Sequence, residues 1–179
     1  MKRAGKRVLH LVVRRKPGHP CRGILSAGPL TLQCALGRGS SSIFKREGDG
    51  ATPVGRHRLL HGFWRNDRIA RPRTALALEP IRRDMGWCEV PGDPSYNRRV
   101  RIPYRSSHER MMRDDHLYDV VIVLDWNIRP RRHGAGSAIF FHLARPGFAP
   151  TEGCVAITRQ AMLRLAPLLS RRSVLVVHR

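Results

Sequence analysis

The chain has 179 residues, 41% of them hydrophobic, which is enough to bury the core of one domain, and no hydrophilic linker divides it. Lys and Arg number 34 against 13 Asp and Glu, so the formal net charge is +21 and polyanions will be attracted to the surface. No apolar stretch approaches membrane-spanning length, and we expect a single domain over residues 1–179 without a transmembrane segment.

The basic N-terminus is followed by an apolar run at 8–13 that His10 interrupts and Arg14 ends, so no signal peptide is recognisable. Along most of the chain, short apolar runs are separated by Gly, Pro and Ser, a pattern that predicts a mainly β fold. The predicted strands cover residues 9–13, 30–36, 56–60, 74–78, 100–102, 120–124, 138–143 and 174–177.

The run at 120–124 consists of consecutive branched apolar residues, so we expect it to be buried on both faces. One clear helix is predicted after Thr158, which can cap it, because Met162 and Leu165 recur on one side. A weaker helical pattern covers residues 107–113.

The four cysteines are too few and too scattered for a disulfide scaffold, and none forms a Cys-x-x-Cys pair. His108-Glu109 resembles the start of a zinc-protease helix, but Met112 stands where the second histidine would be needed. We therefore predict no metal site and no cofactor.

The most informative segment runs from His142 to Cys154, because a cysteine nucleophile needs an imidazole to take its proton and amide groups to receive an oxyanion. A buried structural histidine and a buried structural thiol are the alternative interpretation. An uncompensated imidazole would be costly in the apolar run around His142, and Gly153 allows an unusual backbone angle before the cysteine. These features favour Cys154, His142 and Gly153 as a catalytic group.

Two motifs then add a family resemblance. Thr151, Glu152, Gly153 and Cys154, preceded by a strand histidine, resemble the Ser/Thr-x-Gly-Cys signature of the L,D-transpeptidase catalytic domain family (YkuD-like), and residues 50–55 match its earlier Thr-Pro-x-Gly segment. The chain is most similar to a short single-domain branch. It departs from the family pattern at Glu152, where histidine is common, and at Val155, where Arg or Asn is common.

The resemblance implies a β-sandwich with one or two short helices, and an enzyme acting on peptidoglycan stem peptides in the periplasm or cell wall. Cys154 would attack a stem-peptide amide and form a thioester, His142 would act as its proton-transfer partner, as an imidazolium beside the thiolate, and the Gly153 and Cys154 amides would receive the oxyanion. A second amine would resolve the thioester, forming a 3-3 cross-link or exchanging the terminal D-amino acid.

Four residues are candidate substrate contacts. Tyr118 would donate a hydroxyl near the oxyanion, Arg145 would bind a carboxylate, and the loop residues Thr151 and Glu152 would anchor the substrate. His142 also needs an orienting acceptor, for which the resemblance favours a backbone carbonyl over side chains such as Asp125 or Glu152.

Two alternatives stay open. Water in place of the amine would make the protein an L,D-carboxypeptidase or amide hydrolase, since both reactions share the thioester. The +21 charge would also suit a basic nucleic-acid-binding module, although no helix-turn-helix, zinc-finger or RNA-binding signature supports specific binding.

Overall fold

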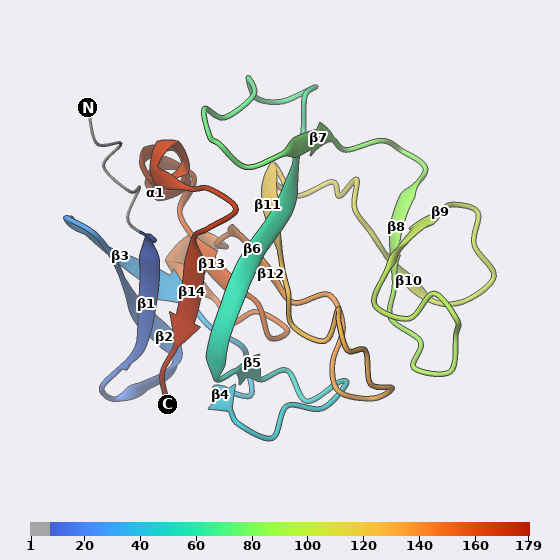
Figure 1. Ribbon diagram of the computed structural model, residues 1–179, viewed down its shortest axis with the longest axis horizontal. Coiled ribbons are helices and arrows are strands. Elements are labelled where there is room, and N and C mark those ends of the chain that lie inside the picture. Colours follow the sequence, from blue (N-terminus) through green and yellow to red (C-terminus); the bar gives the residue numbers. More distant parts are fainter. Residues whose placement is uncertain (1–7) are drawn as a thin grey trace, which may run out of the picture.

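The computed structural model describes residues 8–179 and is mainly β, with 39% of residues in strands and 8% in helices, which confirms the predicted fold class (Figure 1). Residues 1–7, on which the expectation of no signal peptide partly rests, lie outside the described part. No helix between residues 8 and 179 is long and apolar enough to span a bilayer.

The largest sheet has nine strands in the order β11-β12-β13-β3-β2-β1-β14-β6-β7. An additional pairing of β11 with β6 closes this sheet on itself, and β7 extends it beside β6. Its strands are β1 (His10–Lys16), β2 (His19–Ala27), β3 (Leu30–Ala35), β6 (Gly55–Trp64), β7 (Leu78–Pro80), β11 (Val120–Leu124), β12 (Phe140–Leu143), β13 (Val155–Ile157) and β14 (Val174–Val177).

A three-stranded sheet in the order β10-β8-β9 lies at the opposite end of the molecule from α1, and a two-stranded sheet pairs β4 with β5 (Figure 1). The remaining elements are β4 (Ser41–Ser42), β5 (Thr52–Pro53), β8 (Met85–Cys88), β9 (Arg99–Arg101), β10 (His108–Arg110), α1 (Arg159–Leu165) and the 3₁₀ helices Pro146–Phe148 and Ala166–Leu168.

The two largest hydrophobic cores lie on the two faces of the closed sheet, and a small third cluster contains Ala35, Ala144 and Ala156. The larger core lies inside the closed sheet and includes the α1 residues Met162 and Leu165. The second core lies between the other face of β11 and β12 and the three-stranded sheet, and contains Trp87. Strand β11 contributes to both, because alternate residues of a strand point to opposite faces, and this confirms its predicted burial on both faces.

Helix α1 begins as predicted. Thr158 is its N-cap, and its hydroxyl accepts a hydrogen bond from the Ala161 amide at 3.2 Å. The α-helix ends at Leu165, and the turn that contains Pro167 continues as a 3₁₀ helix.

Two predicted elements were wrong. Residues 107–113 are not helical, because His108 to Arg110 form the edge strand β10, which pairs with β8. The strand predicted at 74–78 begins only at Leu78, since the Thr74 hydroxyl and the Ala75 amide both bond to the Leu169 carbonyl after α1.

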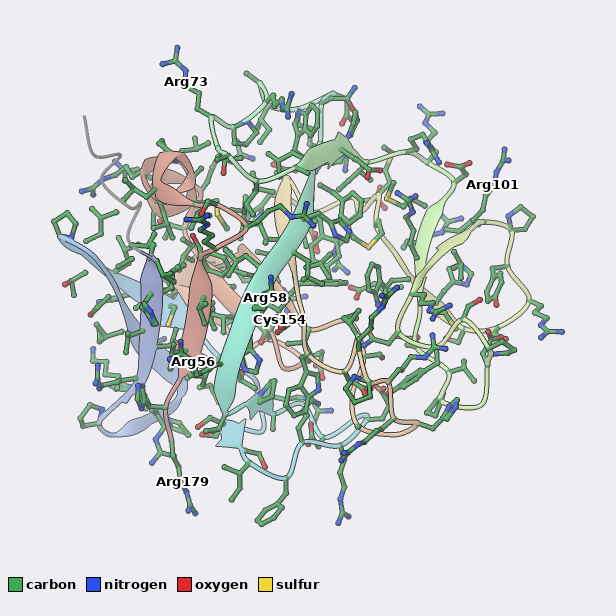
Figure 2. The ribbon with its side chains drawn as sticks, in the orientation of Figure 1. Arg56, Arg58, Arg73, Arg101, Cys154 and Arg179 are labelled. Carbon is green, nitrogen blue, oxygen red and sulfur yellow. The ribbon has the colours of Figure 1, made fainter. Side chains whose placement is uncertain are left out.

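The arginine side chains are spread over the molecule. Figure 2 shows Arg73, Arg101 and Arg179 at three well-separated points of its outline, whereas Cys154 lies in the middle of the view. The positive charge is therefore dispersed in space as it is along the chain.

Candidate active site

His142 and Cys154 lie on the same face of two neighbouring strands. Strands β12 and β13 run parallel with His142 opposite Ala156, so the position opposite Phe140 falls on Cys154, directly before β13. The Phe140 amide donates to Cys154 Sγ at 3.3 Å, which is consistent with that register. Because strand residues two apart share a face, the imidazole and the thiol point to the same side of the sheet.

The two side chains open onto one cavity of about 510 Å³. Every predicted substrate contact also lines this cavity, namely Tyr118, Arg145, Thr151 and Glu152. Gly153 does not line it. The structure therefore brings the predicted nucleophile, base and substrate contacts together around a single space.

The loop before Cys154 is shaped by a glycine and a hydroxyl. Gly153 has φ +121°, and a Cβ atom there would lie 2.8 Å from the Ala51 carbonyl oxygen. Any other residue would therefore have both an unfavourable backbone conformation and a steric clash. The Thr151 hydroxyl donates to the Cys154 carbonyl at 2.7 Å and accepts from the Gly153 amide at 3.2 Å. Thr151 therefore fixes the conformation of the loop. The Gly153 amide already donates to the Thr151 hydroxyl, although we expected it to donate to an oxyanion. The Cys154 amide is the candidate donor that remains.

His142 is oriented by a backbone carbonyl. Its Nδ1 lies 2.8 Å from the Leu143 carbonyl oxygen, and since a carbonyl can only accept, Nδ1 carries the hydrogen and Nε2 keeps its lone pair. The side-chain alternatives have other partners: Asp125 accepts from the Arg58 amide, and Glu152 pairs with Arg38. Burial lowers the pKa of His142 to about 4.

Cys154 is 6% exposed, and its thiol donates to the Ala138 carbonyl at 3.3 Å. Burial raises the pKa of Cys154 to about 12, while the Phe140 amide opposes that rise. With His142 near 4 and Cys154 near 12, both groups are neutral at pH 7. The expected imidazolium and thiolate pair is therefore disfavoured at rest, because burial disfavours the charged form of each group.

A carboxylate that the sequence analysis missed lines the same cavity. Glu109 Oε1 accepts from the Tyr118 hydroxyl at 2.7 Å and from Arg113 Nη1 at 3.0 Å. The Tyr118 ring lies edge-on to the His142 ring, with centroids 5.3 Å apart. The Tyr118 hydroxyl thus donates to Glu109, where we expected it to donate to an oxyanion. We had predicted a helix over residues 107–113, and this prediction gave no reason to place Glu109 at the site. Glu109 lines the cavity because strand β10 pairs with β8.

Arg145 and Glu152 stand at the exposed part of the cavity. Arg145 is exposed and forms no ion pair with any residue from 8 to 179, so its guanidinium is available to a ligand. Glu152 pairs with Arg38 Nε at 2.7 Å, and both side chains are more than half exposed. Such an exposed ion pair contributes little to the free energy of unfolding, but it keeps Glu152 beside Arg38.

One comparison with known proteins decides the family. The model of the L,D-transpeptidase catalytic domain (YkuD) matches residues 24–177, which is most of the chain. The chain belongs to the L,D-transpeptidase catalytic domain family. Searches of curated proteins and of solved structures find no match.

Family membership carries a coarse functional statement. L,D-transpeptidases of this family are generally cysteine-dependent, act on peptidoglycan and are typically found in the periplasm or cell wall. Among residues 8–179, no group of three or more His, Cys, Asp or Glu side chains is arranged to hold a metal ion. The cavity of this L,D-transpeptidase domain is lined by the thiol of Cys154, the imidazole of His142 and several charged side chains.

Proposed function

We propose that this protein is an L,D-transpeptidase that forms an acyl-enzyme at Cys154 with a peptidoglycan stem peptide. The observation that carries the proposal is the shared cavity: the thiol of Cys154 and the imidazole of His142 project from one face of adjacent strands into a single space. Family membership supports the same chemistry.

In the first half-reaction, Cys154 Sγ attacks the carbonyl carbon of the stem-peptide bond while His142 Nε2 accepts the thiol proton. The Cys154 amide donates to the oxyanion, and His142 then returns the proton to the departing nitrogen as the C–N bond breaks. The leaving group is the terminal D-alanine of a tetrapeptide. Its carboxylate fits the free guanidinium of Arg145.

In the second half-reaction, an amine attacks the thioester, the C–S bond breaks and the thiol is restored. The side-chain amine of a neighbouring stem's diamino acid would give a 3-3 cross-link, and a free D-amino acid would give exchange. The reaction would take place in the periplasm or cell wall, where family members typically act.

The test is acylation of the whole protein by a muropeptide that contains a tetrapeptide stem, followed by intact-protein and peptide mass spectrometry. We expect a covalent increment on Cys154 in the wild type and none in Cys154→Ala. Cys21→Ala is the matched control, because Cys21 is a half-exposed thiol that does not line the cavity. A label on another residue, or no label at all, would contradict the proposal.

Transfer and hydrolysis are separated by the products. With an added D-amino acid, a transpeptidase should release the exchanged stem peptide, whereas a carboxypeptidase should release the tripeptide regardless of the addition. Liquid chromatography of the soluble products, with and without the D-amino acid, gives the ratio.

A further inference from the structure

Glu109 has one carboxylate oxygen held by the protein and one left free. Oε1 accepts from both Tyr118 and Arg113, whereas Oε2 accepts from no residue between 8 and 179. Within that range Ser41 Oγ is the one buried side-chain oxygen or nitrogen without a partner, so Glu109 Oε2 is reached by solvent. The Glu109 side chain is 23% exposed and lines the cavity that Cys154 and His142 share.

Glu109 is also electrostatically close to the sulfur. Burial is the main cause of the raised pKa of Cys154, and the negative charge of Glu109 raises it further. Tyr118 connects the carboxylate to the imidazole, since its hydroxyl bonds to Glu109 and its ring contacts the His142 ring. Three further glutamates line the cavity: Glu47, Glu89 and Glu152 accept from Tyr96, Ser107 and Arg38, and Glu152 raises the pKa of Cys154 less than Glu109 does. Glu109 differs from them in its bond to Tyr118, whose ring contacts the His142 ring.

The second half-reaction needs a group of this kind. An alkyl amine has a pKa of about 10.4, so at neutral pH the acceptor arrives as an ammonium ion without a lone pair. A protein with a net charge of +21 repels a cation, and four cationic side chains, Arg113 and Arg145 among them, line the cavity together with four glutamates. Productive binding therefore requires a local carboxylate that attracts the ammonium ion and can take its proton.

We propose that Glu109 binds the acceptor, with Oε2 pairing with its ammonium group and taking up the proton that the nitrogen must lose before it attacks the Cys154 thioester. This role rests on the proposed acyl-transfer function and deepens it, because it names the residue that binds the acceptor amine and takes its proton.

The protons and bonds of this step balance. The ammonium ion gives one proton to Glu109, and the nitrogen lone pair attacks the thioester carbon. The nitrogen gives its second proton to His142 Nε2, which passes it to sulfur as the C–S bond breaks. The products are the new amide, the neutral thiol and protonated Glu109, which then loses its proton to solvent.

The surroundings of Glu109 suit a base. Burial raises its pKa, and the nearby charge of Glu89 acts in the same direction, while the Tyr118 hydroxyl and Arg113 oppose the rise. Arg113 is itself held by Asp115 at 2.7 Å, so the carboxylate has a fixed direction in the cavity. A carboxylate that is both more basic than usual and fixed in place can accept a proton from a bound ammonium ion.

The test uses Glu109→Gln, which keeps an oxygen for Tyr118 and removes only the charge and basicity. Wild type and variant are acylated with a tetrapeptide stem, and the loaded protein is mixed with a labelled stem tripeptide whose diamino acid has a free amine. Acylation of Cys154 is read by mass spectrometry, and the thioester is followed into amide product or hydrolysis product. We expect acylation in the variant at least as fast as in the wild type, because loss of the Glu109 charge lowers the pKa of Cys154. Transfer to the amine should be approximately 10²-fold slower, with hydrolysis as the main fate of the thioester.

Glu79→Gln is the matched control, because Glu79 pairs with Arg99 and does not line the cavity, so its transfer rate should equal that of the wild type. Unchanged transfer in Glu109→Gln would overturn the role of Glu109. An equal loss of acylation and transfer would also overturn it, since that pattern indicates a structural role. Failure of the wild type to acylate would instead refute the acyl-transfer function itself, and the role of Glu109 with it.

Discussion

At the scale of single residues, the thiol and the imidazole are both neutral at rest. Cys154 and His142 are 6% and 5% exposed, and burial disfavours the charged form of each. In the proposed mechanism, proton transfer from sulfur to Nε2 would therefore accompany the attack on the substrate instead of preceding it. The orientation of the ring by the Leu143 carbonyl matters for this reason, since Nε2 must already carry a lone pair.

The depressed pKa of His142 predicts the acid limb of the acylation rate. The imidazole must be neutral to accept the thiol proton, and it becomes protonated only as the pH falls through about 4. We expect the rate of Cys154 acylation to be maintained well below pH 6.5, the usual pKa of histidine, and to fall near pH 4. Single-turnover acylation measured from about pH 3.5 to pH 8 checks this. A midpoint near 6.5 would show that the imidazole is more hydrated than its burial implies.

The lowered pKa of His142 also determines how the free energy of unfolding changes with pH. Between the folded pKa of about 4 and the unfolded value of 6.5, the unfolded chain binds the extra proton. The free energy of unfolding therefore falls as the pH drops through that window and is unaffected by this group above it. Urea unfolding at each pH also identifies the range in which the acylation rates refer to folded protein.

At the scale of elements, the loop between β12 and β13 depends on Gly153. We predict that Gly153→Ala lowers the free energy of unfolding by about 1–3 kcal/mol, because alanine is strained at φ +121° and its Cβ would approach the Ala51 carbonyl to 2.8 Å. It should also slow acylation, since Thr151 and Cys154 are tied to that backbone. Chemical denaturation and the acylation assay give the two readouts.

The control for that substitution is Gly92→Ala. A Cβ at Gly92 would meet no atom within 4 Å, and its φ is not positive, so we expect the free energy of unfolding to change by less than about 0.5 kcal/mol. Equal stability of the two variants would mean that the loop relaxes around the added methyl group and that Gly153 is not required for its shape.

Much of the fold could be predicted at this scale, because apolar runs such as 120–124 are buried for the reason that makes them recognisable. Strand β2 was missed, since Pro20 and Gly23 read as turn residues. The structure explains Gly23, because a Cβ there would lie 2.9 Å from Cys34 Sγ and from the Arg14 carbonyl. Such close approaches between strands leave no trace in the periodicity of one strand.

In the candidate site too, local features could be predicted from the sequence and long-range contacts could not. The motif and the family resemblance brought out Cys154 and His142, whose side chains are local to one short segment. Glu109 reaches the cavity only through the pairing of β10 with β8. The Gly153 amide is occupied because it donates to the Thr151 hydroxyl. Contacts made by long-range pairing cannot be read from local pattern, and the organisation of residues 1–179 as one domain stays a prediction.

At the scale of the whole molecule, the arginines that carry much of the +21 charge are dispersed over the surface (Figure 2). The site instead combines carboxylates and guanidinium groups in one cavity. Charges that are spread and exposed act on a polyanion collectively and are screened by salt over about 8 Å at physiological ionic strength. Attraction to the wall polymer and chemistry at Cys154 should therefore respond differently to salt.

We predict that binding of the protein to isolated sacculi weakens steeply as salt rises from about 50 to 300 mM, because the release of counterions by exposed arginines is less favourable at high salt. Acylation of Cys154 by a single soluble stem peptide should change far less over the same range, since Cys154 and His142 are buried and only Arg145 among the groups assigned to the acylation step is exposed to salt. Co-sedimentation measures the binding to sacculi, and single-turnover mass spectrometry measures the acylation.

Binding to random duplex DNA, as a competing polyanion, should show the same steep loss with rising salt and no sequence preference. Salt-resistant binding to a particular duplex would instead point to nucleic acid as a specific partner, because dispersed surface charge alone cannot distinguish one base sequence from another.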